Sequence, residues 1–255
     1  MVAATYFNVR LRNMLSEHSP FLNIPVALDS KQALFLDGLR HAIQISDLAY
    51  KRLCIALKDQ ADAQSKDRAY DSFVPIFLDA WAFIDAVDRF RSLWEAQPNA
   101  KSINGEFSAA AVRLKLQGIR DLRNISDHIA QKIDQIVSMN SSVLGSIRWL
   151  SLTSESPLRI RTCFIRPGIV RSKVNGQLAI PTKRINFVNS SACITVAAGR
   201  HEFLLDDAYE LLRGIVSFAE TSLALSFQQP SLTKRNPSDL IGVAELDVSG
   251  MERTT

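Results

Sequence analysis

The sequence predicts an α+β fold, in which an N-terminal helical bundle precedes a small antiparallel β-sheet with a C-terminal helix packed on it. The apolar residues recur at steps of three and four up to about residue 142 and at shorter, strand-like intervals after it. Amphipathic helical spacing then returns after about residue 206. We therefore divide the chain into a helical bundle (1–142), a basic sheet with its helix (143–228) and a loose, polar tail (229–255).

Three long helices account for most of the first segment. The first should begin at Asp29 or Ser30, either of which is a suitable N-cap, and end near Lys58. The second should span about 70–95, and the third about 108–139 with Gly118 as its only interruption. A short helix over about 4–16 should precede them and stop before Pro20.

Strands dominate the second segment. Residues 158–164 alternate apolar and basic side chains, which is the period of a half-buried strand. Residues 174–177 contain an Asn-Gly pair, which favours a hairpin turn. Further strands are predicted at 185–188, 192–197 and 201–205, the last two joined across Gly199 and Arg200. Asp206 or Asp207 should cap a helix that continues to Phe227.

The composition excludes several classes of protein. The chain has 255 residues, a net charge of +4 and no apolar run of the about 18 residues that a membrane span needs. No secretory signal pattern is present near the N-terminus. The three cysteines are odd in number and widely spaced, which argues against a disulfide framework and favours the cytoplasm. No phosphate-binding glycine loop occurs, and we expect no cofactor.

A metal site built by the protein is not expected either. The four histidines are scattered, without carboxylates or cysteines at ligand spacing. Asp79, Asp85 and Asp88 share one predicted helix and could hold a metal ion. Asp85 and Arg89 are also spaced for an i,i+4 ion pair, and we favour ion pairing as the role of these acids.

Basic residues are concentrated early in the sheet segment. Between positions 148 and 184 there are eight basic residues against one acid, Glu155. Such an excess suits a surface that faces a polyanion such as RNA, and equally a solvated basic face of the sheet. The residues proposed to hold RNA are Arg159, Arg161, Arg171 and Lys173.

The third helix carries the strongest candidate for a catalytic site. Its isoleucine-rich seam forms one stripe on a helical wheel, and the polar residues lie opposite that seam. Arg123 and His128 lie about 140° apart on the two margins of the polar face. The polar residues are Arg120, Arg123, Asn124, Asp127 and His128.

This set of residues suits cleavage of an RNA phosphodiester. A histidine that titrates near neutrality can move the proton of the 2′-OH or of the leaving group. A permanently charged arginine can hold the scissile phosphate, and Asn124 can orient either side chain. The reaction needs no metal, because the 2′-OH supplies the nucleophile. The structural alternative is a solvated helix face on which Arg123 pairs with Asp127.

The stretch from Arg123 to His128 resembles the motif of the HEPN family (higher eukaryotes and prokaryotes nucleotide-binding domains), in which four to six residues separate an Arg from a His. The resemblance implies a HEPN-like bundle over about 28–140 and a metal-independent endoribonuclease that acts as a homodimer. Such proteins serve as toxins or anti-phage effectors and have an antitoxin or defence partner. Arg123 and His128 would be catalytic, with Asn124, Asp127 and Arg120 in support.

Two features of the sequence limit the resemblance. Arg12 and His18 also fit the looser motif, although they lie on the short N-terminal segment. Ala130 stands where toxins of this family that are controlled by nucleotidylation commonly have a Tyr. The alternatives to an enzyme are a non-catalytic HEPN-like module that binds a nucleotide or partner, and a structural subunit of a larger assembly.

Overall fold

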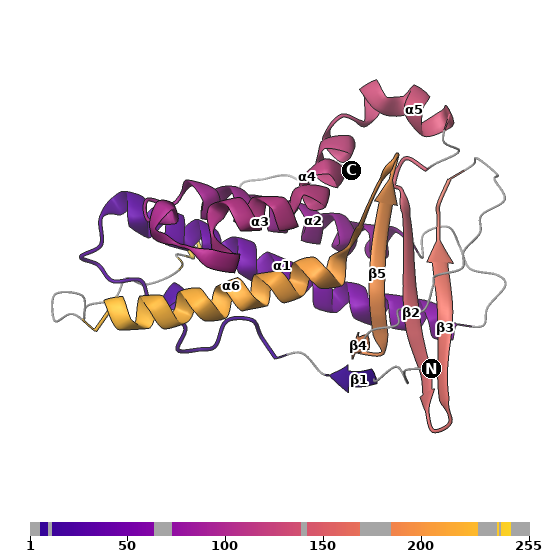
Figure 1. The fold of residues 1–255 in the computed structure, drawn as a ribbon, viewed down its shortest axis with the longest axis horizontal. Helices are drawn as coiled ribbons and strands as arrows, with labels where there is room; N and C mark the ends of the chain where they lie inside the picture. Colours follow the sequence, from indigo (N-terminus) through magenta and orange to yellow (C-terminus); the bar gives the residue numbers. More distant parts are fainter. Residues whose placement is uncertain are drawn as a thin grey trace.

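The computed structural model describes residues 6–9, 12–63, 73–138, 142–168, 185–228, 239 and 241–245. It confirms the α+β class: after one N-terminal strand the helices come first, the other strands follow, and a C-terminal helix packs against both. In Figure 1 the long helices run side by side and the sheet stands across one end of them. The fold therefore has a helical layer and a sheet that share one boundary.

The helical layer is built on two long helices, α1 (Ser30–Asp62) and α2 (Val74–Ala96), which pack along each other. Asp29 caps α1 as predicted, because its carboxylate accepts hydrogen bonds from the backbone N–H groups of Lys31 and Gln32. The shorter helices of the layer are η1 (Pro20–Leu22), η3 (Ala100–Ser102), η4 (Gly105–Phe107), α3 (Ala109–Lys115), α4 (Gln117–Asp127), η5 (Ile129–Lys132) and α5 (Ile133–Ser138).

The prediction of one continuous third helix was wrong. The chain leaves the helical conformation at Leu116, between α3 and α4, and again at His128, after α4. Gly118 is not the break. It lies inside α4, where a Cβ atom would come within 2.3 Å of the Phe203 ring. Apolar periodicity continues across both breaks, so the sequence pattern alone could not reveal them. Both α3 and α4 pack on α2, and α4 also packs on β6.

Within the described residues the sheet has six strands in the order β1-β4-β5-β2-β3, with β6 paired to β5. They are β1 (Tyr6–Val9), β2 (Ser146–Glu155), β3 (Leu158–Ile165), β4 (Ile185–Val188), β5 (Ser191–Ala198) and β6 (His201–Leu204). Five strands pair antiparallel, and β1 pairs parallel to β4. The predicted helix over about 4–16 was therefore wrong. Residues 6–9 form β1, which pairs with β4, a strand far away in the sequence.

The strands after residue 158 match the prediction, whereas β2 was not predicted. The turn between β4 and β5 uses Asn189 and Ser190, both with positive φ, as a two-residue hairpin requires. The Asn-Gly turn predicted at 174–177 lies outside the described residues. In β5, Cys193 and Ile194 stand opposite the single residue Trp149 of β2, which makes a β-bulge.

The C-terminal helix α6 spans Leu205–Ser226, close to the prediction, but neither predicted cap is used. Its N-cap is Leu204, which makes no side-chain capping bond. Asp206 instead accepts hydrogen bonds from the backbone N–H groups of Cys193 (3.0 Å) and Ile194 (2.7 Å). These are the two residues of the bulge, whose N–H groups a long-range partner satisfies.

One hydrophobic cluster joins the two segments of the chain. It contains residues of α1, α2, α4, β2, β5 and α6, and a smaller cluster forms on the opposite face of the sheet around Leu150 and Phe187. Within the predicted tail, Asp239 forms an ion pair with the buried Arg40 at 2.9 Å. Among the described residues, no helix is long and apolar enough to cross a membrane.

Candidate functional site

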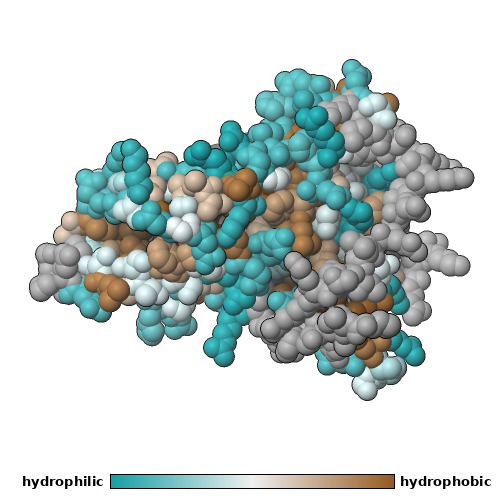
Figure 2. Space-filling view, viewed as in Figure 1, coloured by the Kyte–Doolittle hydropathy of each residue, from teal (hydrophilic) through white to brown (hydrophobic). Residues whose placement is uncertain are grey.

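The candidate site lies on α4, which is held between α2 and β6. Ile119, Leu122 and Ile125 are buried, as the apolar seam predicted. The close approach of Gly118 to Phe203 fixes the other side of the helix. In Figure 2, hydrophilic side chains cover most of the surface around α4 and α5, at the upper right.

Arg123 is anchored to two acids of α2. Its Nη1 donates a 2.7 Å hydrogen bond to Asp88, and its Nε lies 3.1 Å from an oxygen of Asp85. Asp127 on α4 lies farther away, at 3.7 Å. The hydrogen bond to Asp88 raises the pKa of Arg123, so the guanidinium is permanently charged. Its remaining terminal nitrogen, Nη2, donates no hydrogen bond to a described residue, and about a third of the side chain is exposed.

Asp88 connects Arg123 to a wider network within the helical layer. Asp88 is 3% exposed and also receives a 2.8 Å hydrogen bond from Nε of Arg91. Arg91 reaches Glu95 at 2.7 Å, and Glu95 in turn pairs with Arg113 of α3 at 2.8 Å. A buried carboxylate between two arginines thus sets the position of Arg123.

His128 occupies a different kind of position. It is the C-cap of α4, with φ −117° and ψ 29°, and its backbone N–H donates to the carbonyl of Ile125 at 3.3 Å. The carbonyl of His128 accepts from Gln131 and Lys132, which starts η5. The imidazole is exposed and makes no hydrogen bond or ion pair with a described residue. It is therefore open to a ligand from solvent.

The three predicted supporting residues lie between these two positions. Arg120, Asn124 and Asp127 are all exposed on α4. Asp127 is the only one of them that approaches another charged side chain of the described residues, through Arg123. On the polar face of α4, the Arg123 side chain is therefore held by ion pairs, whereas the His128 side chain has no partner among the described residues.

A second histidine reaches α4 from the sheet, and the sequence did not point to it. Nδ1 of His201, on β6, lies 3.6 Å from the carboxylate of Asp121, and Nε of Arg200 lies 3.2 Å from Nε2 of His201. Gln117 donates to the other oxygen of Asp121 at 2.8 Å. Positions 117 and 121 share one helix face, but the approach of β6 depends on tertiary packing.

The sheet arginines predicted to bind RNA are only partly available. Arg161 donates from Nη1 to the carbonyl of Ala61 at the end of α1, although its side chain is exposed. Arg159 is exposed, and its guanidinium has no hydrogen-bonding partner among the described residues. Arg148 pairs with Glu202 of β6. Arg171 and Lys173 lie outside the described residues.

The acids of α2 take part in ion pairs, as the sequence suggested. Arg89 lies 2.7 Å from Asp85, and Arg52 lies 3.2 Å from Asp79. No group of three or more potential metal ligands occurs within the described part of the chain. The cysteines at 54, 163 and 193 are free thiols. Burial raises the pKa of Cys193 to about 12, so this thiol is not a nucleophile at neutral pH.

The other Arg–His stretch, from Arg12 to His18, does not form a helix. Both residues are exposed in an irregular segment before η1. Asn13 of this stretch accepts a 3.1 Å hydrogen bond from Lys51 of α1. The α4 copy is the one with a rigid helical support.

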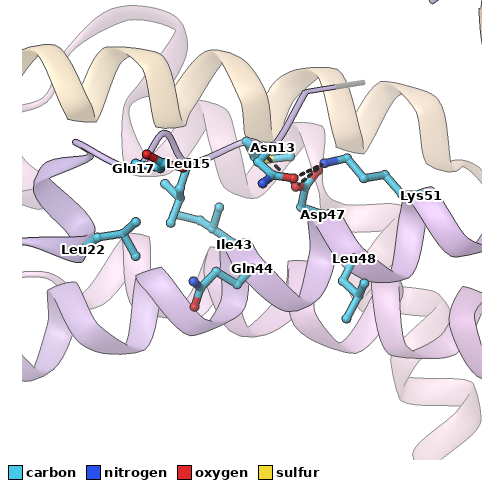
Figure 3. Close-up of a pocket in the computed structure, with 10 residues that line it drawn as sticks. Asn13, Leu15, Glu17, Leu22, Ile43, Gln44, Asp47, Leu48 and Lys51 are labelled. Carbon is cyan, nitrogen blue, oxygen red and sulfur yellow. Dashed lines mark hydrogen bonds and ion pairs between the residues drawn. The ribbon is translucent and has the colours of Figure 1, made fainter. Parts of the chain in front are cut away.

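The irregular segment covers a second polar cluster that the sequence did not reveal. Asp47 on α1 accepts from the Tyr209 hydroxyl (2.7 Å), from Nζ of Lys51 (2.6 Å) and from the backbone N–H of Met14 (3.1 Å). Figure 3 shows Asp47, Lys51 and Asn13 pointing toward one another at the wall of a cavity of about 310 Å³. Burial and the bond to Asp47 raise the pKa of Tyr209. The cluster is satisfied internally, and we assign it a structural role.

Comparison of the chain with protein-family models, with curated protein sequences and with solved structures finds no match in any of the three. The function has to be argued from the site itself.

Proposed function

We propose that the protein is a metal-independent endoribonuclease of the HEPN type, with Arg123 and His128 as its catalytic residues. The observation that carries the proposal is the contrast within α4. Arg123 is held by Asp88 and Asp85 with Nη2 free of hydrogen bonds to described residues, and His128 is exposed and unpaired among them five positions later. A positioned cation and an available imidazole on one helix face suit the cleavage of an RNA phosphodiester.

The reaction assigns a proton transfer to His128 and charge stabilisation to Arg123. The 2′-oxygen attacks phosphorus as its proton leaves to a base, and the 5′-oxygen departs as it receives a proton, giving a 2′,3′-cyclic phosphate and a 5′-hydroxyl. Arg123 stabilises the negative charge that builds on the phosphoryl oxygens. Asn124 and Arg120 are exposed on the same helix and can contact the phosphate. Asp127 can help to position Arg123 through its ion pair with Nε.

The chemistry also supports a homodimer. Cleavage needs one group to accept a proton and another to donate one. Here α4 itself carries a single histidine, and the nearby His201 of β6 is paired with Asp121. Two copies related by a two-fold axis would bring two His128 side chains to one cleft. Arg159 and Arg161, with Arg171 and Lys173, would hold the RNA chain beside that cleft. An antitoxin or another defence protein would be the partner that controls such an activity.

The test is cleavage of a mixed-sequence RNA in the presence of EDTA. We expect wild-type cleavage, with the rate reduced roughly 100-fold or more by either Arg123→Ala or His128→Ala. Arg213→Ala is a matched control, because this residue is exposed on another helix. His18→Ala tests the other Arg–His stretch and should have no effect.

Several results would overturn the assignment. These are no cleavage by the wild type at any protein concentration, cleavage that requires Mg²⁺, or cleavage that survives both α4 substitutions. A second assay asks whether expression is toxic to cells and whether His128→Ala relieves the toxicity.

A non-catalytic module that binds a nucleotide or partner is the second candidate, and one observation favours it. Three carboxylates lie within 4 Å of Arg123, so its charge is already compensated. A structural subunit is favoured by the exposed apolar residues of α1, among them Leu34, Leu48 and Ile55. For either candidate, Arg123→Ala should change stability or association without any RNA cleavage to lose, and the mass in solution should reveal an assembly.

A further inference from the structure

One side of α1 faces away from the core, and aliphatic side chains are concentrated on it. From His41 to Asp59 the exposed residues of this side follow one another at alternating steps of four and three, so they share one stripe of the helix. The same spacing forms the contact seam of coiled coils. Its exposed aliphatic residues are Leu34 (72%), Ile45 (46%), Leu48 (58%) and Ile55 (50%). We call this stripe, together with the exposed side of α2 beside it, the outer face.

Helix α2 runs antiparallel to α1 along the outer face. Nε of Arg52, late in α1, lies 3.2 Å from Asp79, which is early in α2. Gly38, early in α1, lies opposite Leu93, late in α2, because a Cβ atom at Gly38 would come within 3.0 Å of the Leu93 side chain. The first turns of α2 therefore lie beside the last turns of α1.

Those first turns of α2 extend the aliphatic part of the outer face. Val74 and Leu78 are 57% and 61% exposed and lie on the same side of α2. The antiparallel arrangement places them near Ile55 of α1. Large exposed aliphatic side chains on two adjacent helices mark an interaction surface.

The arginines of the outer face are already paired within the chain. Arg52 pairs with Asp79, and Arg89 lies 2.7 Å from Asp85. A face whose arginines are compensated in this way attracts neither RNA nor an anionic lipid surface, since both bind through unpaired cations. The outer face therefore suits another protein surface.

Two titratable groups remain, and they lie toward opposite ends of the α1 stripe. His41 is exposed; its Nε2 lies 3.6 Å from Asp37, and its Nδ1 makes no hydrogen bond with a described residue. Asp59 is exposed, and its carboxylate has no partner among the described residues. A basic group at one end and an acid at the other make the stripe complementary to a reversed copy of itself.

An antiparallel pair of α1 helices about a two-fold axis at the level of Tyr50 uses this complementarity. Positions 41 and 59 are equally far from position 50, so His41 of each copy faces Asp59 of the other. Positions 45 and 55 are also equally far from position 50, so Ile45 faces Ile55. A parallel pair would instead place each group against its own copy and form no ion pair.

The size of the outer face matches what a stable homodimer needs. Helices of 33 and 23 residues are about 50 Å and about 35 Å long, and each presents a strip about 10 Å wide. Together the strips cover about 800 Å² per copy, which is the share of one partner in an interface of standard size.

We propose that the outer face of α1 and α2 is the surface through which two copies of this chain pair, antiparallel about a two-fold axis. Asp85 of α2 lies 3.1 Å from Nε of Arg123, so α4 borders this face. The axis keeps α1 on α1 and α2 on α2, and both α4 helices then lie along the same edge of the dimer. A shared cleft with two His128 side chains at that edge rests on the proposed function, whereas the interface does not.

The first test is the mass of the full chain in solution, measured by sedimentation over micromolar concentrations. We expect the wild type to have twice the mass of one chain. Leu48→Asp places a charge near the axis twice and should weaken association roughly 100-fold or more. Leu114→Asp is the matched control, because Leu114 is 80% exposed on α3, outside the outer face, and it should pair like the wild type. Circular dichroism checks that both variants are folded.

A charge exchange tests the antiparallel arrangement. Asp59→Lys should weaken association roughly tenfold, because the two-fold axis repeats its contact with His41. Adding His41→Asp to the same chain should restore the wild-type affinity. The proposal is overturned if the wild type stays monomeric, if Leu48→Asp pairs like the wild type, or if the second substitution restores nothing. A dimer that cleaves no RNA would support the interface and contradict the ribonuclease, and RNA cleavage by a monomer would do the reverse.

Discussion

Two carboxylates in this fold are surrounded in opposite ways. Asp88, between α2 and α4, is buried against the guanidinium groups of Arg91 and Arg123. Asp206, between α6 and β5, accepts hydrogen bonds from the backbone N–H groups of Cys193 and Ile194 and pairs with no cation among the described residues. The negative charge of Asp88 is therefore balanced by two cations, whereas that of Asp206 is stabilised by backbone dipoles.

This difference affects both stability and function. Burial raises the pKa of Asp206 to about 6, because no cation offsets the loss of hydration. Asp206 serves the sheet, since it satisfies the β5 bulge. Asp88 holds an arginine that is partly open to solvent, so the same kind of buried acid supports the candidate site.

The largest expected effect is that of Asp88→Ala. The substitution leaves Arg91, 6% exposed, and Arg123 without their shared partner, and we expect a loss of about 4 kcal/mol in the free energy of unfolding. The measurement is urea denaturation. Asp85→Ala on the same helix is the control and should cost about 1 kcal/mol or less, because Asp85 is partly exposed. Equal losses for the two variants would show that the buried pair is not special.

The next effect is a dependence on pH at Asp206. The folded state binds its proton more tightly than the unfolded state, so the stability that Asp206 contributes is greatest near pH 4 and falls as the pH rises through about 6. Relative to Asp206→Asn, which does not titrate, the wild type should lose up to about 3 kcal/mol between pH 4 and pH 7. Parallel stability curves for the two proteins would contradict the raised pKa.

The smallest effect should come from Arg123→Met. Arg123 is about a third exposed, and its ion pairs are partly screened by water, so the loss of stability should stay below about 1 kcal/mol. The same denaturation assay measures it. A loss as large as that of Asp88→Ala would mean that Arg123 is chiefly a structural residue, and would favour the non-catalytic candidate.

Local signals explain which parts of the fold could be predicted. The Asp29 cap, the two long helices, the strands after residue 158 and the last helix follow from spacing and capping within a few residues. The strand β1 could not be found in this way. Its partner β4 lies about 180 residues away, and short apolar runs fit helices and strands alike.

The candidate site likewise has a part that the sequence predicts and a part that depends on tertiary packing. The sequence by itself determined that Arg123 lies opposite a buried seam, because helical periodicity relates neighbouring residues. Only the tertiary structure decided what each margin of α4 faces: Asp88 and Asp85 from α2 beside Arg123, and Asp121 paired with His201 from β6. The point at which α4 ends, with His128 as its C-cap, was likewise visible only in the structure. Contacts between segments far apart in the chain depend on packing, which a local pattern does not encode.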